Sequence, residues 1–252
     1  MRVLVTGAAS GLGAALTRAF RARGDEVLAT DRVDGEFTLD ITSDADWASA
    51  YSWVQANWGG LDVLVNNAGV AGGGRIDLCT LDEWEWITNI NLFGVVRGTK
   101  TFVPMFKEQR SGHIVNVASL AGLVHPAGMG SYNAVKAAVV AFTETAGHEL
   151  AQYGVKASAV CPSYFRTNLV DSMQGSDETV GKVIGKLVAS SKVTADDIAA
   201  AVLEGMEKGD DVIVPDEAAR FAYFLKWSDR PAYDRMMRDQ AEKLDRADSE
   251  RA

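Results

Sequence analysis

Three polar side chains near the middle of the chain have the types and spacing needed to act together on one substrate oxygen. Ser119 lies thirteen positions before Tyr132, and Lys136 lies four positions after it. Residues four apart on a helix share one face, with their Cβ atoms about 5–6 Å apart. An ammonium about 4 Å from a phenol would lower the usual tyrosine pKa of about 10 by as much as roughly three units. The pattern therefore predicts proton exchange by Tyr132 with help from Lys136.

The segment around Ser119 indicates where these side chains would meet. Ser119 follows the apolar run 113–118, which is typical of a buried parallel strand. Open α/β sheets bind ligands in the crevice at the carboxyl ends of their strands. Because a Tyr-x-x-x-Lys pair also arises by chance, its interpretation depends on motifs elsewhere in the chain.

A glycine-rich turn follows the first apolar run. Residues 2–6 favour a strand, Gly7, Gly11 and Gly13 follow, and apolar residues then recur at helical spacing up to Gly24. Glycines let the backbone approach a pyrophosphate closely, and the N-terminus of the helix binds the anion. The spacing differs from the G-x-G-x-x-G dinucleotide fingerprint, so the turn alone is a weak signal.

The end of the second predicted strand bears on the choice of cofactor. Residues 26–30 lead into Asp31 and Arg32. A carboxylate there accepts the ribose hydroxyls of an adenosine and repels a 2′-phosphate, which favours NAD over NADP. Arg32 keeps NADP as the alternative, because guanidinium groups pair with phosphates. Asp40 either contacts the adenine edge together with Ile41 or only forms a turn before the next helix.

Composition narrows the class of protein. The chain has 252 residues, 47% hydrophobic and 23% charged, which suits one large α/β domain. A net charge of -9 without a basic cluster argues against nucleic-acid binding. Two cysteines without paired spacing suggest neither a zinc site nor a disulfide framework. With no apolar run near 18 residues and no room for a leader, we expect a cytoplasmic protein without integral membrane association.

The remaining segments complete an alternation of strands and helices. Capped helices are predicted to begin after Ser43, Thr80 and Thr194. Strands are predicted at 61–65, 155–160 and 211–215, and the first of these leads into Asn66–Gly69. Asn91 falls inside the helix after Thr80, where asparagine is mildly disfavoured. This hints at a role such as holding a water, and the commoner alternative is an asparagine that faces solvent. Residues 168–192 suit a short helical flap over a pocket.

The region after residue 215 is rich in aromatic side chains. It contains Phe221, Tyr223, Phe224, Leu225 and Trp227, and then a charged run to the end of the sequence. We expect buried packing or a subunit contact, with a membrane-surface role as a weaker alternative. Residues 216–252 are therefore predicted to be a helical extension, packed on the same domain or on a partner subunit.

Taken in order, these motifs give the chain a specific resemblance over residues 1–215. It resembles the classical short-chain dehydrogenase/reductase family. The matching residues are Thr6, Gly7, Gly11, Gly13, Asn66, Asn67, Ala68, Gly69, Asn91, Ser119, Tyr132, Lys136, Pro162 and Thr167. The resemblance implies a single-domain, Rossmann-like, doubly wound parallel sheet of about seven strands flanked by helices. It also implies a nicotinamide dinucleotide at the carboxyl edge and a homodimer or homotetramer.

The resemblance also implies roles for particular residues. The catalytic residues would be Asn91, Ser119, Tyr132 and Lys136, with Asn91 anchoring a water and Lys136 binding the nicotinamide ribose. The cofactor would contact Gly7, Ser10, Gly11, Leu12, Gly13, Asp31, Arg32, Asp40, Ile41, Asn67, Ala68, Gly69, Tyr132, Lys136, Pro162, Ser163, Phe165 and Thr167. Ser163 stands where the family usually has glycine, and the long extension is unusual for standard tetramers.

The substrate is predicted from the side chains expected beside Tyr132. These are Ser119, Val124, Met129, Tyr164, Leu169 and Met173. They are mostly apolar and include no cationic anchor, which favours an apolar secondary alcohol or ketone. The alternatives are a 3-oxoacyl thioester reductase and a non-catalytic dinucleotide-binding sensor or scaffold on the same fold. An intact catalytic set argues against the sensor, and the acidic surface would repel an acidic acyl carrier.

Overall fold

The centre of the protein is a parallel sheet whose strands are short, apolar runs. The computed structural model describes residues 1–167, 169 and 172–249. Its sheet has seven strands in the order β3-β2-β1-β4-β5-β6-β7, within the described residues. The strands are β1 (Arg2–Thr6), β2 (Glu26–Asp31), β3 (Phe37–Thr38), β4 (Val63–Asn66), β5 (Gly112–Val117), β6 (Val155–Val160) and β7 (Val212–Ile213). The predicted doubly wound sheet is confirmed.

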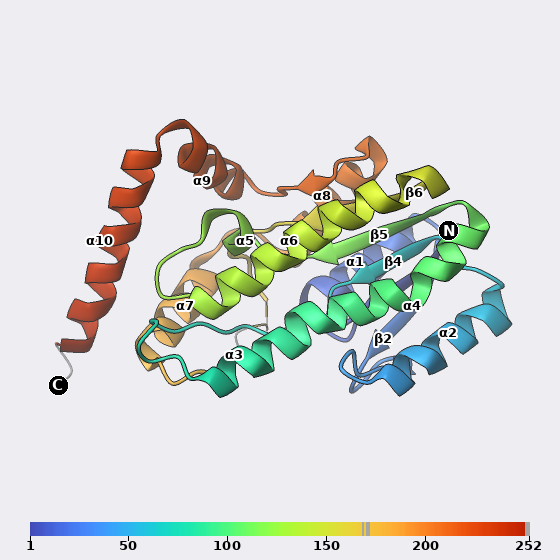
Figure 1. The fold of residues 1–252 in the computed structure, drawn as a ribbon, viewed down its shortest axis with the longest axis horizontal. Coiled ribbons are helices and arrows are strands. Elements are labelled where there is room, and N and C mark those ends of the chain that lie inside the picture. Colours follow the sequence, from blue (N-terminus) through green and yellow to red (C-terminus); the bar gives the residue numbers. More distant parts are fainter. Residues whose placement is uncertain (168, 170–171, 250–252) are drawn as a thin grey trace.

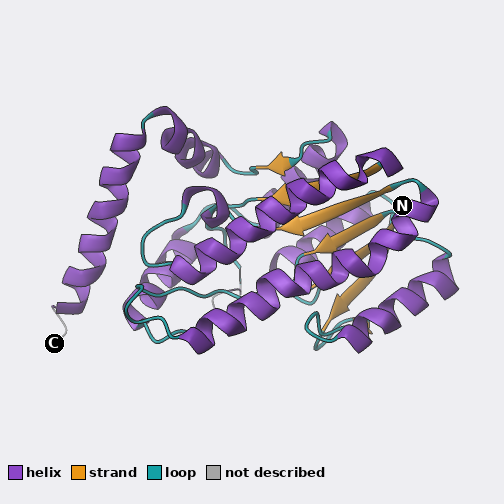
Figure 2. Cartoon of the chain, viewed as in Figure 1, coloured by secondary structure: helices purple, strands orange, loops and turns teal. Residues whose placement is uncertain are grey.

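Helices cover both faces of this sheet (Figures 1 and 2). In chain order they are α1 (Gly11–Ala22), α2 (Asp44–Trp58), α3 (Leu81–Thr88), α4 (Gly94–Gln109), α5 (Ala121–Val124), α6 (Gly130–Leu150), α7 (Glu178–Ser190), α8 (Ala195–Lys208), α9 (Glu217–Ser228) and α10 (Arg230–Ser249). Ser43, Thr80 and Thr194 each accept a hydrogen bond from the backbone N–H three residues on. These hydrogen bonds confirm the three predicted caps. Such caps can be predicted from sequence because they depend on residues close together in the chain.

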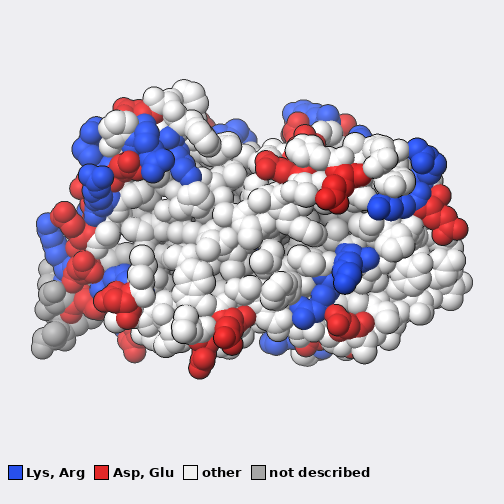
Figure 3. All heavy atoms as spheres, in the orientation of Figure 1, with Lys and Arg blue, Asp and Glu red and all other residues white. Residues whose placement is uncertain are grey.

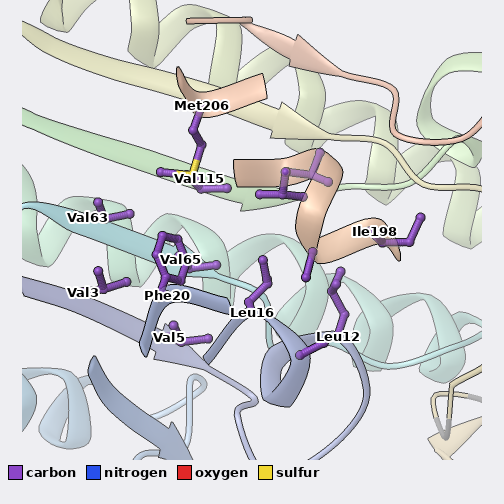
Figure 4. Packing of buried hydrophobic residues seen from close by; sticks show 14 of the residues in the cluster. Val3, Val5, Leu12, Leu16, Phe20, Val63, Val65, Val115, Ile198 and Met206 are labelled. Carbon is purple, nitrogen blue, oxygen red and sulfur yellow. The ribbon is translucent and has the colours of Figure 1, made fainter. Parts of the chain in front are cut away.

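Alternation along the strands divides the core between the two faces. Val3 and Val5 point to the side covered by α1 and α8, where they pack with Phe20, Ile198 and other buried residues (Figure 4). Leu4 points the opposite way and packs with side chains of α2 and α4. Both faces are buried, which explains the nearly continuous apolar strands in the sequence.

The strand order reverses between β1 and β4. From β1 the chain runs outward to β2 and β3, and it then returns to build β4 to β7 on the other side. The loops after neighbouring strands β1 and β4 therefore turn away to opposite faces and leave a crevice between them. This is the edge at which the sequence places Gly7, Asn67 and Ser119.

The helix after Thr80 is not uniform. A π-helical turn (Asn89–Phe93), labelled η1, joins α3 to α4. The sequence predicted an uninterrupted helix here. A π turn widens the helix by one residue and is common at functional sites. Its middle residue is Asn91.

The C-terminal arm, defined here as α9 and α10, extends along one end of the molecule (Figure 1). Phe221, Phe224 and Trp227 on α9 are 65%, 68% and 74% exposed. Packing within the chain therefore does not account for these three rings, and a subunit contact remains a prediction. Figure 3 shows charged groups of both signs over the arm and few over the first half of α6.

Candidate active site

The glycine turn after β1 brings the backbone close to the crevice. Gly7 and Gly11 have φ of 66° and 51°, which L side chains rarely adopt. Gly13 lies inside α1, where a Cβ atom would lie 2.0 Å from the Gly7 carbonyl oxygen and 2.6 Å from Asn67 Nδ2. Ser10 is the N-cap of α1, its side chain makes no capping bond, and the first turn has no acidic residue. This cradle fits the pyrophosphate of a dinucleotide.

A methyl group at position 13 should therefore open the cradle. We expect Gly13→Ala to raise the Kd for NAD about 10- to 100-fold and to lower the melting temperature, because overpacking costs about 1–3 kcal/mol. Titration calorimetry and thermal unfolding would measure both effects. Gly147→Ala in α6 is the matched control, since its Cβ would lie 3.7 Å from the Ala157 Cβ, an ordinary contact. An unchanged Kd in Gly13→Ala would contradict this account.

Asn67 fastens the loop after β4 to the glycine turn. Its Nδ2 donates hydrogen bonds to the carbonyl oxygens of Thr6 and Gly7, at 2.9 and 3.3 Å. The Thr6 hydroxyl accepts from the backbone N–H groups of Asn67 and Ala68, both at 3.0 Å. A Cβ on Gly69 would lie 2.9 Å from Asn91 Oδ1. These contacts explain why this loop has asparagine and glycine at the predicted positions.

The cofactor-discriminating residues lie at the rim of the crevice. Asp31 ends β2 and accepts hydrogen bonds from the N–H of Ala9 at 3.1 Å and of Val33 at 3.4 Å. Arg32 is exposed at the same rim. Asp40 accepts from the backbone and hydroxyl of Thr42, at 2.8 and 2.7 Å. The turn-forming alternative therefore accounts for the Asp40 carboxylate, although Asp40 and the buried Ile41 both line the cavity.

The three chemical side chains meet at the carboxyl end of β5. Tyr132 and Lys136 lie one turn apart on α6 and are 8% and 5% exposed. The Ser119 hydroxyl lies close enough to the Tyr132 phenol to lower its pKa, and its Oγ accepts a hydrogen bond from the N–H of Ala121 at 3.1 Å. Lys136 Nζ donates to the Val117 carbonyl at 2.9 Å and lies 5.7 Å from the centre of the Tyr132 ring. The predicted trio is thus assembled around one point.

The electrostatics of this trio differ from the sequence-based expectation. Burial raises the pKa of Tyr132 to about 12, and the Ser119 hydroxyl offsets only part of that rise. Burial also lowers the pKa of Lys136 to about 8. The expectation that Lys136 brings the Tyr132 pKa below its usual value is wrong for this structure. Both side chains leave water, and desolvation disfavours the charged form of each.

Asn91 supports the neighbouring loop through its side chain. It is 1% exposed, its Oδ1 accepts from the N–H of Val70 at 2.8 Å, and its Nδ2 donates to the Val70 carbonyl at 2.9 Å. Each amide atom makes one hydrogen bond here and has the capacity for one more, so a water at this residue could bind its side chain or its backbone. The π turn exposes backbone groups of that kind, since it disrupts the regular helical hydrogen bonds.

The hydroxyl of Ser163 is bound by a residue of the C-terminal arm region. Ser163 Oγ donates to Asp216 Oδ1 at 2.6 Å, and its backbone N–H donates to Asp216 Oδ2 at 2.9 Å. Asp216 is 7% exposed and caps α9. The residue that departs from the family pattern therefore links the loop after β6 to the C-terminal arm.

One cavity of about 640 Å³ joins these residues, within the range of about 300–1,000 Å³ usual for ligand sites. Its lining includes the predicted residues Gly7, Ser10, Gly11, Leu12, Asp31, Arg32, Asp40, Ile41, Asn67, Ala68, Gly69, Ser119, Val124, Met129, Tyr132, Lys136, Pro162, Ser163, Tyr164, Phe165, Thr167 and Leu169. Gly13 and Asn91 lie behind the wall and support it. Met173 packs in the hydrophobic cluster with Val180 and Ile184 and does not line the cavity.

Sequence reasoning missed part of the apolar wall. Val70, Trp86, Pro126, Ile184 and Val188 also line the cavity. Ile184 and Val188 belong to α7, within the predicted flap 168–192, of which residues 168, 170 and 171 lie outside the described residues. The spacing of Ile184 and Val188 at i and i+4 could have indicated a shared face. Trp86 carries no comparable signal, because α3 has other aromatic and apolar residues.

Comparisons with known proteins show the family of this chain. A family model described as short chain dehydrogenase matches residues 1–178. Momilactone A synthase of Oryza sativa subsp. japonica is 34% identical over 221 residues, which cover 79% of this chain and 81% of that protein. D-beta-hydroxybutyrate dehydrogenase of Cupriavidus necator is 32% identical over 239 residues, which cover 88% and 89%.

Solved structures share the fold along nearly the whole chain. A short-chain dehydrogenase/reductase of Burkholderia phymatum in complex with NAD has a TM-score of 0.84 and 28% identity, covering 90% of this chain and 93% of that one. A short-chain dehydrogenase of Burkholderia cenocepacia in complex with NADP has a TM-score of 0.80 and 28% identity, covering 94% and 96%. The chain belongs to the short-chain dehydrogenase family, whose members are NAD(P)-dependent oxidoreductases.

Two further kinds of feature to consider are a membrane-spanning helix and a metal-binding group. No helix among the described residues is long and apolar enough to span a membrane. The described part of the chain also contains no group of three or more His, Cys, Asp or Glu side chains arranged to hold a metal ion.

Proposed function

We propose that this protein is an NAD-dependent dehydrogenase or ketoreductase that interconverts an apolar secondary alcohol and its ketone. The observation that supports this most strongly is the position of Ser119, Tyr132 and Lys136 at a wall of the cavity, next to an apolar part of its lining that includes Val124, Met129, Ile184 and Val188. Among the described residues, the charged side chains lining that cavity are Asp31, Arg32, Asp40 and Lys136. The first three lie at the proposed adenosine end. Lys136 is the cation beside Tyr132, and in this proposal it acts on the phenol and the nicotinamide ribose, so no further cation of the described lining is left to bind a substrate carboxylate or phosphate.

In this proposal the residues divide the proton transfer among them. When bound, the nicotinamide supplies the hydride for reduction and accepts it in oxidation. Tyr132 gives its phenolic proton to the carbonyl oxygen during reduction and takes a proton from the hydroxyl during oxidation. Ser119 donates a hydrogen bond to the same oxygen. The Lys136 ammonium would stabilise the phenolate that reduction leaves behind, and a water held near Asn91 would return a proton to it.

The cofactor would lie across the carboxyl edge of the sheet. Gly7, Gly11 and Gly13 would hold its pyrophosphate, and Asp31 would bind the adenosine ribose. Phe165 and Thr167, after β6, would contact the nicotinamide end. We favour NAD because the Asp31 carboxylate would repel a 2′-phosphate.

The cofactor proposal predicts a shift in specificity on neutralising that carboxylate. We expect Asp31→Asn to raise the ratio of kcat/KM for NADP to kcat/KM for NAD by about tenfold or more, because the repulsion of the phosphate is removed. Steady-state rates with both cofactors would measure the ratio. Arg32→Ala is the companion variant, and we expect it to change the ratio little. A large loss of NADP activity in Arg32→Ala would instead assign phosphate binding to that arginine.

The 3-oxoacyl thioester reductase remains the second candidate for the substrate. A 3-oxoacyl-[acyl-carrier-protein] reductase of Thermotoga maritima is 33% identical over 188 residues, which cover 68% of this chain and 76% of that protein. The net charge of -9 disfavours an acidic carrier. Assays with acetoacetyl-coenzyme A and with cyclohexanone, each with NADH, separate the two. Faster turnover of the thioester would reject the apolar ketone.

The same proposal includes the setting of the enzyme. We propose a homodimer or homotetramer, supported by the sparsely charged surface over the first half of α6. We also propose a cytoplasmic location, supported by the reduced state expected for the free cysteines Cys79 and Cys161. A non-catalytic sensor has less support, because it needs no complete set of Ser119, Tyr132 and Lys136. Sedimentation velocity tests the assembly.

A further inference from the structure

The N-terminal part of helix α10 contacts one wall of the substrate cavity. The Tyr233 side chain is 3% exposed, and its hydroxyl donates a hydrogen bond to the Val124 carbonyl. Val124 is the last residue of α5 and lines the cavity. His125 follows it with a φ of 56°, a conformation in which a non-glycine residue is strained. The Tyr233 contact therefore holds the chain at a strained turn beside the substrate.

The same turn receives a second contact from the arm. Lys226 Nζ on α9 donates to the Leu123 carbonyl and to His125 Nδ1, the latter at 2.9 Å. The His125 ring also contacts the Gly122 carbonyl through Nε2, at 3.2 Å. The backbone from 122 to 125 is thus fixed from outside by side chains about one hundred residues later in the sequence.

Farther along α10, Leu244 contacts both sides of the cavity. Leu244 is 4% exposed and belongs to the hydrophobic cluster that contains Tyr132 and Ile184. A Cβ on Gly128 would lie 2.7 Å from Leu244 Cδ1 and 3.1 Å from Val180 Cγ2. Gly128 precedes Met129, whose side chain lines the cavity, and Val180 belongs to α7. Leu244 therefore fills the space between the 124–129 loop and the flap helix.

Ion pairs through Arg75 connect the last turns of α10 to the N-terminus of α7. Arg75 forms ion pairs with Asp245 at 3.2 Å and Asp248 at 2.7 Å. Arg75 also pairs with Asp177, the N-cap of α7, at 2.8 Å. Asp248 accepts a hydrogen bond from Thr179 at 2.7 Å. The partners are partly desolvated, since the side chain of Asp177 is fully buried and that of Arg75 is 15% exposed.

We propose that α10 is a brace that fixes the width of the substrate cavity, with Tyr233 and Leu244 as positioning residues for substrate discrimination. Tyr233 and Leu244 lie eleven positions apart, a distance of about 16 Å along a helix. A rigid helix holding the 124–129 loop at one point and α7 at another keeps Val124, Met129 and Ile184 at fixed separation. The inference rests on the proposed function, because it assigns the discriminating surface of that same cavity.

The test removes one hydroxyl and compares two ketones. Tyr233→Phe should lower kcat/KM for decalone about two- to tenfold, mainly through a higher KM, because one hydrogen bond holding the wall is lost. We expect kcat/KM for cyclohexanone to change by less than about twofold, since a small ring does not need a fixed wall. The KM for NADH should stay unchanged. Tyr223→Phe is the matched control, because it removes a hydroxyl from the same arm on a ring that packs against Trp227.

A second readout works without turnover. Amide hydrogen exchange within residues 122–129 should accelerate in Tyr233→Phe and remain at the wild-type rate in Tyr223→Phe. Faster exchange with a changed decalone-to-cyclohexanone ratio supports the brace. Faster exchange with an unchanged ratio overturns it and leaves a purely structural contact. An unchanged exchange rate in Tyr233→Phe also overturns the brace. The exchange rate can be measured even if neither ketone is a substrate of the wild-type enzyme.

Discussion

Replacing Tyr132 with phenylalanine is expected to lower kcat for both ketone reduction and alcohol oxidation by about 10²–10⁴-fold, the usual contribution of general acid–base catalysis. In the proposed mechanism the buried Tyr132 phenol is the proton donor, and phenylalanine keeps the ring while removing the proton. Packing should survive, because the ring and not the hydroxyl belongs to the cluster with Val135 and Ile184. Steady-state kinetics at saturating cofactor measure the loss.

The control for Tyr132 is another tyrosine at the same cavity. Tyr164 also lines it, and its hydroxyl contacts Met129 Sδ at 3.4 Å. Tyr164→Phe should leave kcat within about threefold of wild type, because it removes only a weak hydrogen bond to sulfur. NAD binding should be retained in both variants. A fully active Tyr132→Phe enzyme, or equal losses in the two variants, would contradict the assignment of Tyr132.

Replacing Lys136 with methionine is expected to abolish most activity and yet stabilise the protein. Burial lowers the pKa of Lys136 from 10.5 to about 8, so the ammonium is costly to bury. This lowering of the pKa by about 2.5 units corresponds to about 3 kcal/mol of destabilisation of the folded state, which the substitution removes. Loss of the hydrogen bond to the Val117 carbonyl destabilises the folded state by about 1 kcal/mol. The net expectation at pH 7 is about 2 kcal/mol of added stability. Activity should fall about 10²-fold or more, because the phenolate loses its nearby cation.

The stability difference between Lys136→Met and the wild type is expected to depend on pH. Between pH 8 and 10.5 the unfolded chain binds the Lys136 proton more tightly than the folded chain. Wild-type stability should therefore gain from this group as pH rises through that window, and the advantage of Lys136→Met should shrink. Urea unfolding at pH 7 and pH 9.5 measures the difference. Lys156→Met, at an exposed lysine of β6, is the control, and an equal pH effect there would refute the account.

Features set by neighbours in sequence were predictable in this chain. The glycine turn, the caps at Ser43, Thr80 and Thr194 and the apolar strands depend on local preferences or on alternation, and the structure confirms them. The convergence of Ser119 with Tyr132 and Lys136 was also predictable. Carboxyl ends of parallel strands meet at one edge, and residues four apart share one face of a helix.

Features set by burial and distant contacts were not predictable. The high pKa of Tyr132 depends on the side chains that enclose it, and a spacing of four residues carries no information about that enclosure. The contact of Ser163 with Asp216 and that of Tyr233 with Val124 join positions 53 and 109 residues apart. The π turn at Asn91 likewise accompanies side-chain hydrogen bonds to Val70, 21 residues earlier in the chain. In each case the tertiary fold decides the outcome.

The central claim is direct hydride transfer between the nicotinamide and a substrate carbon, with Tyr132 exchanging the proton. The most direct test uses cyclohexanol deuterated at the carbinol carbon, with NAD and the purified protein, and mass spectrometry of the reduced cofactor. The account predicts one deuterium in NADH at a rate that depends on Tyr132. Reduced cofactor without deuterium, or NAD binding without turnover across a panel of deuterated apolar secondary alcohols, would contradict it.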